Sequence, residues 1–312
     1  MPANAIIHLP VIKITDGENT KTTDALAVEE PLEIRLEYGP ADVRKVQNIS
    51  VTMRTPGNDA ELALGFLFTE GIIKQQSDTG LIEHCFIACA ENKENVIQVS
   101  LKEGVIPNLN NTERNFYTTS SCGVCGKASI NAIRTVGVFN ADESPDNQIN
   151  ADMLYHLPST LQKHQEVFAD TGGLHASALF DTSGELLLVR EDVGRHNALD
   201  KLIGAALNKS LLPLNQHILL LSGRASFELV QKAAMAGINI IAAVGAPSSL
   251  AVQLAEEFNI TLIGFLRNQR FNIYTQPQRI LLPKYETSVC NHGNKINNGH
   301  MEASLPLNNN SF

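Results

Sequence analysis

Tryptophan is absent from this chain of 312 residues, and cysteine is scarce, with five residues spread unevenly along it. An odd, uneven set of cysteines argues against a framework of disulfides and favours a reducing compartment, so we expect a cytoplasmic protein. Long hydrophobic runs are missing as well, and residues 1–10 lack the charged start and apolar core of a secretory signal. We therefore expect no membrane partner.

An excess of positive charge is also missing. The formal net charge is −9 and the pI is about 5.5, whereas a protein that binds DNA or RNA usually carries a basic face. We therefore expect no nucleic-acid partner. What remains is the composition of a soluble globular protein, 43% hydrophobic and 18% charged, in a chain long enough for two domains.

The stretch Ser121–Lys127 contains a Cys-x-x-Cys pair, Cys122 and Cys125, in which each cysteine is followed by glycine. An apolar segment of helical character follows at residues 128–133. A loop that leads into a helix N-terminus directs backbone N–H groups and the positive end of the helix dipole at sulfur. That environment lowers the pKa of a thiol and favours the thiolate, and Lys127 acts in the same direction. We interpret this stretch as a reactive-sulfur loop.

Three other interpretations of the cysteine pair remain open at this point. The pair could be half of a zinc site, which needs two further ligands, or a structural disulfide, or two small packed thiols. Because Cys-x-x-Cys seldom lacks a function, sulfur chemistry or metal binding is favoured over packing.

The first part of the chain shows the apolar alternation of half-buried strands, with one helical segment between them. The alternation predicts strands at residues 6–15, 32–38, 46–53, 81–89 and 95–101, and a helix that begins near Asn58 or Asp59 and ends near Gly71. A polar connector at residues 103–114 marks a domain boundary. We predict a smaller β-rich domain over residues 1–110.

The second part alternates strands and helices, which is the pattern of a sheet covered by helices. The predicted elements are a helix over 151–168 interrupted near Pro158, strands at 186–189, 217–222, 238–243 and 260–265, and helices at 192–207, 226–236 and 248–258. We predict an α/β (α+β) fold, with a larger domain over residues 111–284. The Asn-rich segment 285–312 is predicted to be a disordered tail.

Polar turns follow several of these strands, where open α/β sheets bind ligands. Glu191–Asn197 joins two acids, an arginine and His196, and suits either ligand binding and proton transfer or a charged helix cap. Ser222–Ser226, with Ser222 and Arg224, and Gly245–Ser249 each offer hydroxyls and N–H groups at a helix start. Such a turn suits phosphate, although ordinary capping would explain either one alone.

A further polar turn follows the strand that ends at residue 265. Its residues are Phe265, Leu266, Arg267, Asn268, Gln269, Arg270 and Phe271. Two arginines and two phenylalanines could hold a pyrophosphate and stack on a purine, whereas the alternative is a surface loop with solvated arginines.

Four remaining residues carry weaker signals. His175 follows a double glycine and could be a metal ligand, an acid–base group or a core histidine. Cys85, Cys89 and Cys290 have no clear partner spacing, and we interpret them as packing residues.

Many of these motifs occur in the same order in one family. They are Glu29–Leu32, Thr55–Asp59 with Gly65–Leu67, Ser121–Gly126, Thr171–His175, Glu191–Ala198, Ser222–Arg224, and Gly264–Phe265 with Phe271–Tyr274. Together they cover about residues 20–283, and the sequence resembles the formate dehydrogenase accessory sulfurtransferases, the FdhD family.

The resemblance implies a sulfur carrier. Members of the family accept sulfur from a cysteine desulfurase as a persulfide on the first loop cysteine, which is Cys122 here, with Cys125 as the second. They pass the sulfur to the molybdenum cofactor in its bis-guanine-dinucleotide form, which formate dehydrogenase requires. The nucleotide-binding segment corresponds to Phe265–Arg270. The resemblance also implies a cytidine deaminase-like larger domain, a homodimer, and no tightly bound metal.

Two other function classes compete with sulfur transfer. A zinc hydrolase of the deaminase type would use the Cys-x-x-Cys pair with His175, but deaminases place His-x-Glu before the cysteines, and Ser177 stands at the position of the glutamate. A non-catalytic chaperone would hold the cofactor through its nucleotides and would need no reactive sulfur.

Overall fold

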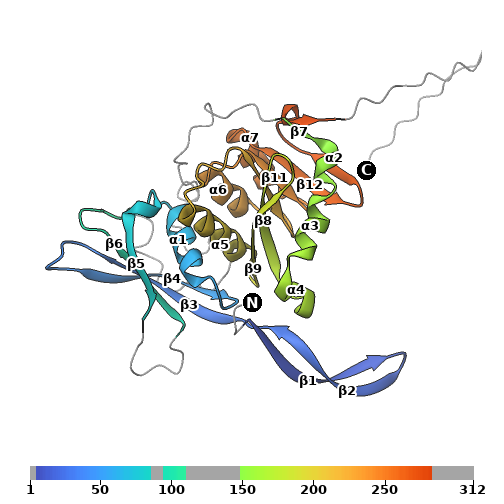
Figure 1. Ribbon diagram of the computed structural model, residues 1–312, viewed down its shortest axis with the longest axis horizontal. Helices are drawn as coiled ribbons and strands as arrows, with labels where there is room; N and C mark the ends of the chain where they lie inside the picture. Colours follow the sequence, from blue (N-terminus) through green and yellow to red (C-terminus); the bar gives the residue numbers. More distant parts are fainter. Residues whose placement is uncertain (1–4, 86–93, 110–147, 283–312) are drawn as a thin grey trace, which may run out of the picture. The chain divides into compact units, whose positions relative to one another are not determined.

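The computed structural model describes residues 5–85, 94–109 and 148–282 of the chain (Figure 1). Residues 1–282 form one unit and residues 283–312 a second. The predicted tail at 285–312 and the reactive-sulfur loop at Ser121–Lys127 lie outside the described residues. The account below concerns the described part of the first unit.

The chain begins with a β-hairpin of two ten-residue strands, β1 (Ile6–Thr15) and β2 (Glu18–Ala27). Strand β1 confirms the prediction for residues 6–15. The polar sequence of β2 carries no strand pattern, and β2 forms because it pairs with β1 along its whole length. Asp16 and Gly17 join the strands with positive φ angles of 53° and 85°, as a two-residue hairpin turn requires.

A four-stranded sheet follows, in the order β4-β3-β6-β5. Its strands are β3 (Glu30–Tyr38), β4 (Lys45–Arg54), β5 (Thr79–His84) and β6 (Val96–Leu101). Strands β3 and β6 are parallel, and the other pairs are antiparallel. The predicted strands in this part are confirmed, except that residues 86–89 lie outside the described residues. Helix α1 (Asp59–Thr69) connects β4 to the 3₁₀ turn η1 (Gln76–Asp78) and confirms the predicted helix.

The central sheet has six strands in the order β13-β12-β11-β10-β8-β9. They are β8 (His175–Asp181), β9 (Leu186–Asp192), β10 (His217–Leu221), β11 (Ile240–Ala243), β12 (Thr261–Arg267) and β13 (Arg270–Ile273). Strands β10, β11 and β12 are parallel, whereas β8, β9 and β13 join antiparallel. The fold is therefore a mixed α/β fold, in which a parallel centre has antiparallel edges.

Helices cover both faces of this sheet (Figure 1). One core contains α1 together with α5 (Arg195–Asn208), α6 (Phe227–Met235) and α7 (Ser249–Glu257). The other contains α2 (Ala151–Leu154) and α3 (Leu157–Lys163). The remaining short elements are α4 (Glu166–Thr171), β7 (Ile149–Asn150), η4 (Pro277–Arg279) and β14 (Ile280–Leu281). None of the helices in the described part combines the length and apolarity that a membrane span requires.

The helix predicted over 151–168 is in fact three short helices, α2, α3 and α4. The interruption predicted near Pro158 is confirmed, because α2 ends at Leu154 and α3 begins at Leu157. Pro158 lies in the first turn of α3, where its missing N–H costs no hydrogen bond. A second break, which the sequence did not predict, falls at His164–Gln165.

Helices α1 and α5 cross with their backbones in direct contact. A β-carbon added at Gly65 would lie 1.9 Å from the carbonyl oxygen of Asp200, and one added at Gly204 would lie 1.9 Å from that of Glu61. This contact gives residues from the two predicted domains, 1–110 and 111–284, a shared hydrophobic core. The predicted boundary itself adjoins residues 110–147, which lie outside the described residues.

Candidate functional site

The three parallel strands end at one edge of the central sheet, where the loops that follow them are hydrogen-bonded to one another. The N–H of Gly245 donates to the carbonyl of Gly223 at 2.9 Å, and the N–H of Phe265 donates to that of Gly245 at 3.0 Å. Ala225 and Pro247 form a further parallel bridge. A β-carbon at Gly245 would lie 3.0 Å from backbone atoms of Gly223 and Arg224, so glycine permits this approach. We call this end of the sheet the carboxyl edge.

The two turns predicted to bind phosphate therefore lie side by side, as expected for successive parallel strands. Several of their N–H groups are already used, because Ala225 donates to Ala246 and Ser248 donates to Ala225. The hydroxyl of Ser248 caps α7 by accepting from Ala251. The alternative prediction for Gly245–Ser249, ordinary helix capping, is therefore correct for the hydroxyl of Ser248. Ser222 likewise accepts from the N–H of Ala176 at 2.8 Å, which ties β10 to β8.

His175 joins the same edge from the first residue of β8. Strand β8 runs antiparallel to β10, so its start lies beside the end of β10, with Ser177 opposite Leu221. The imidazole packs against Gly223, whose added β-carbon would lie 3.3 Å from Nδ1. Burial, together with the positive charges of Arg195 and His196, lowers the pKa of His175, and the opposing effect of Asp192 is smaller. His175 is therefore neutral at pH 7.

His196 lies in the first turn of α5 and pairs with a carboxylate that the sequence did not single out. Its Nε2 lies 3.2 Å from Glu228 in α6 and 3.4 Å from the hydroxyl of Ser226. The hydroxyl of Ser226 donates to Glu228. Burial acts to raise the pKa of Glu228, but the hydrogen bond and charge of His196, with Ser226, bring it below its ordinary value. Glu228 could have been found from the sequence only as an acid at the start of the predicted helix 226–236.

The predicted nucleotide segment Phe265–Arg270 is not a loop after the strand, as expected, but the end of β12 and a hairpin turn into β13. Asn268 and Gln269 form the turn with positive φ angles of 52° and 55°. Leu266 is fully buried, and its side chain belongs to the core. Phe271 packs against Tyr155, with ring centroids 5.6 Å apart.

The arginines of this hairpin are more informative. Arg267 and Arg270 lie directly opposite each other across the β12–β13 ladder, and both are exposed. Like charges in this position repel each other. The described residues place no carboxylate within ion-pair distance of either arginine, nor of the exposed Arg224 at the same edge. The carboxyl edge therefore carries positive charge that an anion could neutralise.

The first residues of the motif Glu191–Asn197 have a structural role. The carboxylate of Glu191 accepts from the N–H groups of Val167 and Phe168 at 3.1 and 2.9 Å, which holds the start of α4. The buried Asp192 pairs with Lys201 at 2.7 Å and accepts hydrogen bonds from the N–H of Thr55 and the side chain of Asn197. These two acids are therefore structural, but neither caps the helix that follows the motif, because the N-cap residue of α5 is Gly194 and has no capping side chain.

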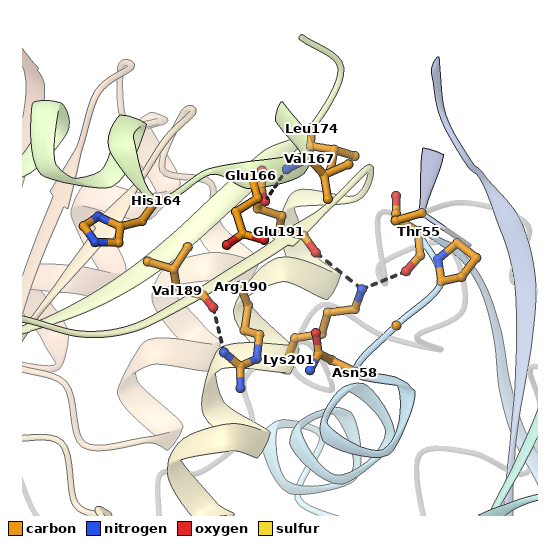
Figure 2. Close-up of a pocket in the computed structure, with 13 residues that line it drawn as sticks. Thr55, Asn58, His164, Glu166, Val167, Leu174, Val189, Arg190, Glu191 and Lys201 are labelled. Carbon is orange, nitrogen blue, oxygen red and sulfur yellow. Dashed lines mark hydrogen bonds between the residues drawn. The ribbon is translucent and has the colours of Figure 1, made fainter. Parts of the chain in front are cut away.

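Asp192, Lys201, Asn197 and Thr55 form a network that joins the two predicted domains, and we call it the Asp192–Lys201 joint. Lys201 donates to the carbonyl of Thr55 at 2.8 Å, as Figure 2 shows, and Asn197 donates to that of Met53 at 2.7 Å. Every polar atom that Lys201 contacts is an acceptor. Thr55 belongs to the first predicted domain and Lys201 to the second. The joint therefore has a structural role, because its polar groups bind one another.

A cavity of about 230 Å³ lies beside the joint (Figure 2). Its walls include Thr55, Asn58, Arg190, Glu191 and Lys201. The two cations are already paired, Lys201 with Asp192 and Arg190 with Glu61 through two hydrogen bonds. None of the residues predicted to bind a cofactor lines this cavity, so we place the candidate site at the carboxyl edge.

The predicted cysteine site lies in a different part of the chain. Cys122 and Cys125 lie outside the described residues, as do Cys89 and Cys290. Cys85 is a free, partly buried thiol 3.6 Å from the side-chain oxygen of Gln98, and burial raises its pKa. That environment agrees with the predicted packing role. The described residues contain no cluster of three or more histidine, cysteine or acidic side chains suited to a metal ion.

Comparison with known proteins agrees with this set of motifs. The sequence model of the FdhD/NarQ family matches residues 27–281. The chain belongs to the FdhD/NarQ family. The match begins at the last residue of β2, so it covers both sheets and the carboxyl edge but not the rest of the β1–β2 hairpin.

Curated relatives cover nearly the same span. The sulfur carrier protein FdhD of Streptomyces coelicolor is 51% identical over 275 residues, which are 87% of this chain and 94% of the relative. The protein of the same name from Mycolicibacterium paratuberculosis is 54% identical over 274 residues, 86% of this chain and 97% of that relative. The FdhD of Sulfolobus acidocaldarius is 42% identical over 275 residues, 88% and 98% of the two chains.

A solved structure has the same fold. It is a crystal structure from Desulfotalea psychrophila, described as a formate dehydrogenase accessory protein, with a TM-score of 0.66 and 24% sequence identity. The similarity covers 89% of this FdhD/NarQ chain and all of the solved chain. At this level of identity the comparison bears on the fold alone.

Proposed function

We propose that this protein is a sulfur carrier that makes formate dehydrogenase active. Cys122 accepts sulfur from a cysteine desulfurase and passes it to the molybdenum cofactor in its bis-guanine-dinucleotide form. The observation that carries this proposal is the Cys-x-x-Cys stretch Ser121–Lys127 in a member of the FdhD/NarQ family. Relatives around 50% identical over most of the chain bear the name sulfur carrier protein.

The loading step is an exchange between thiol and persulfide. The thiolate of Cys122 attacks the outer sulfur of the persulfide on the donor enzyme, and the sulfur–sulfur bond of the donor breaks. The outer sulfur becomes bonded to Cys122, and the donor cysteine leaves as a thiolate, so the step needs no external oxidant. A lowered pKa at Cys122 favours this step because the thiolate is the attacking form.

Cys125 supplies a route for release. Its thiolate can attack the inner sulfur of the Cys122 persulfide, which forms a Cys122–Cys125 disulfide and frees the outer sulfur as hydrosulfide. The two electrons that this release requires come from the two thiols. A reductant then restores the pair for a new cycle.

The cofactor is the acceptor, and we place its nucleotide part at the carboxyl edge. The proposed contacts are Ser222, Arg224, His196 and the segment Phe265, Leu266, Arg267, Asn268, Gln269 and Arg270. Unpaired arginines at Arg224, Arg267 and Arg270 support this placement, since guanidinium groups suit phosphate and stack on purines. Leu266 would contribute through its backbone only, because its side chain is buried.

Four further parts of the proposal are implied by the resemblance. The larger domain is similar to cytidine deaminases, the protein is a homodimer, and its partners are a cysteine desulfurase and formate dehydrogenase. A cytoplasmic location follows from the uneven set of cysteines. No tightly bound metal is expected.

The proposal is tested by formate dehydrogenase activity in cells that lack their own carrier and receive variants of this protein. Cys122→Ala and Cys122→Ser should abolish activation, since neither side chain can hold a persulfide. Cys85→Ala is the matched control, because Cys85 is a partly buried free thiol in the four-stranded sheet, and it should activate normally. Full activation by Cys122→Ala would contradict the sulfur-transfer mechanism. It would favour a non-catalytic chaperone that holds the cofactor and carries no sulfur.

A further inference from the structure

Arg195 is the first residue of α5, at the carboxyl edge. Its Nε atom is buried and has no hydrogen-bond partner among the described residues. No described carboxylate pairs with its guanidinium either. The side chain is only partly exposed, so water does not replace the missing partner at Nε.

The other buried arginines of the described chain are bound through at least one of their nitrogens. The Nε atom of Arg279 also lacks a hydrogen-bond partner, but Nη1 of that residue donates to Thr261. Arg54 is 1% exposed and donates to Asp59 through two nitrogens and to Asn95. Arg190 is bound by Glu61 through two nitrogens and by a backbone carbonyl. A buried donor without a partner is destabilising. Arg195 differs from these arginines because none of its nitrogens has a partner among the described residues. We infer that its partner is a ligand that is bound only part of the time.

The residues around Arg195 favour a partner of negative charge. Two histidines, His175 and His196, lie nearby, and the charges of Arg195 and His196 both lower the pKa of His175. The acids in reach have other partners, because Asp192 is paired with Lys201 and Glu228 with His196. The N-cap residue of α5, Gly194, has no capping side chain, and the first turn of α5 contains no acid. A cation would be repelled here, whereas an anion would find an unused donor.

We propose that Arg195 and His175 hold a phosphate oxyanion of a nucleoside diphosphate at the carboxyl edge, between the loop at Gly223 and the start of α5. The guanidinium supplies the charge-assisted hydrogen bonds, and the neutral imidazole, packed on Gly223, supplies one further hydrogen bond. The choice of guanine as the base rests on the proposed function, whereas the phosphate site itself is argued from Arg195 and His175. The arginines at Arg267 and Arg270 lie on β12 and β13, several strands away, so Arg195 serves a separate part of the ligand.

Binding of guanosine diphosphate, measured by calorimetry, tests this site, with inorganic pyrophosphate as the second probe. Arg195→Gln removes the charge but retains a side chain of similar length, and it should weaken binding of guanosine diphosphate roughly tenfold or more. Arg195→Lys keeps the charge without the planar fork and should lose less affinity. Lys209→Gln, at the other end of α5, is the matched control and should bind as the wild type does.

Thermal unfolding separates a binding role from a structural one. Because Nε of Arg195 has no partner in the described chain, Arg195→Gln should unfold at the same temperature as the wild type or higher. Unchanged affinity in Arg195→Gln would overturn the proposal, as would a wild-type protein that binds neither probe. A large fall in unfolding temperature, together with no recovery of affinity in Arg195→Lys, would also overturn it in favour of a structural role.

Sulfur loading is a separate readout. Persulfide formation at Cys122 should be the same in Arg195→Gln as in the wild type, because the donor reaction does not use the nucleotide. If the wild type forms no persulfide but Arg195→Gln still loses affinity for guanosine diphosphate, the sulfur-carrier proposal fails and the phosphate site stands.

Discussion

The Asp192–Lys201 joint and the carboxyl edge contain similar side chains in opposite states. In the joint, a buried lysine and a buried aspartate satisfy each other, and backbone groups from Thr55 complete the network. At the carboxyl edge, Arg195, Arg224, Arg267 and Arg270 have no partner among the described residues. The motif Glu191–Asn197 contributes to both regions, with Asp192 and Asn197 in the joint and Arg195 at the carboxyl edge. The paired charges stabilise the fold, whereas the unpaired charges are available to an anionic ligand, as we propose.

The comparison predicts different responses to mutation. Changes in the joint, or in the helix crossing beneath it, should lower the free energy of unfolding. Changes among the unpaired cations should alter binding with little effect on stability.

The largest loss of stability is expected for Gly204→Ala. The added β-carbon would lie 1.9 Å from the carbonyl oxygen of Glu61, which is backbone and cannot rotate away. We expect a loss of about 4 kcal/mol, more than the roughly 1–3 kcal/mol usual for overpacking, because two helices must separate. Chemical denaturation measures it. Gly173→Ala is the control, since its nearest neighbour would be 3.9 Å away, and equal stability of the two variants would contradict the close crossing.

Lys201→Met should cost about 3 kcal/mol or more, because it leaves Asp192 buried without its cation. Denaturation of Lys201→Met, Asp192→Asn and the double variant forms a cycle. The double variant should be more stable than the sum of the single losses predicts. Strict additivity would mean that the two side chains do not act as a pair.

A smaller and pH-dependent effect is expected for Glu228→Gln. His196 and Ser226 bring the pKa of Glu228 below its ordinary 4.5, so the charged form is favoured in the folded state. A carboxylate with a lowered pKa stabilises the fold above its unfolded pKa, and that contribution is lost as the pH falls through the folded value.

Glu228→Gln should therefore be less stable than the wild type by about 1 kcal/mol or less at pH 7, and the difference should vanish at low pH. Urea denaturation at several pH values measures this. A difference that stays constant down to pH 3 would show that Glu228 acts through packing rather than through its charge.

The elements that could be predicted from the sequence are those whose pattern lies within their own residues. Strand β1 alternates apolar residues, helix α1 has its acid in the first turn, and β10 to β12 are short apolar runs separated by helices. The sequence pattern missed β2, since a polar strand such as residues 18–27 is determined by its partner. It also missed the second break in 151–168, at His164–Gln165, where neither residue is a glycine or a proline.

The candidate site shows the same division. The turns at Ser222–Ser226 and Gly245–Ser249 were each predicted from local sequence at the start of a helix. They lie together because successive parallel strands end at one edge. The roles of Glu191 and Asp192 could not be read locally, because their partners at Val167 and Thr55 come from elsewhere in the chain. The pairing of His196 with Glu228 could not be predicted either, because it depends on the tertiary packing of α5 against α6. The roles of Cys122 and Cys125 remain predictions from the motif and the family.

The central claim of this account is that Cys122 carries sulfur, and intact mass spectrometry tests it most directly. The purified protein is incubated with a cysteine desulfurase and L-cysteine, beside Cys122→Ala and Cys85→Ala. We expect the wild type and Cys85→Ala to gain the mass of one sulfur atom, which a reductant removes, and Cys122→Ala to gain nothing. No added sulfur in the wild type, or equal loading of Cys122→Ala, would contradict the claim.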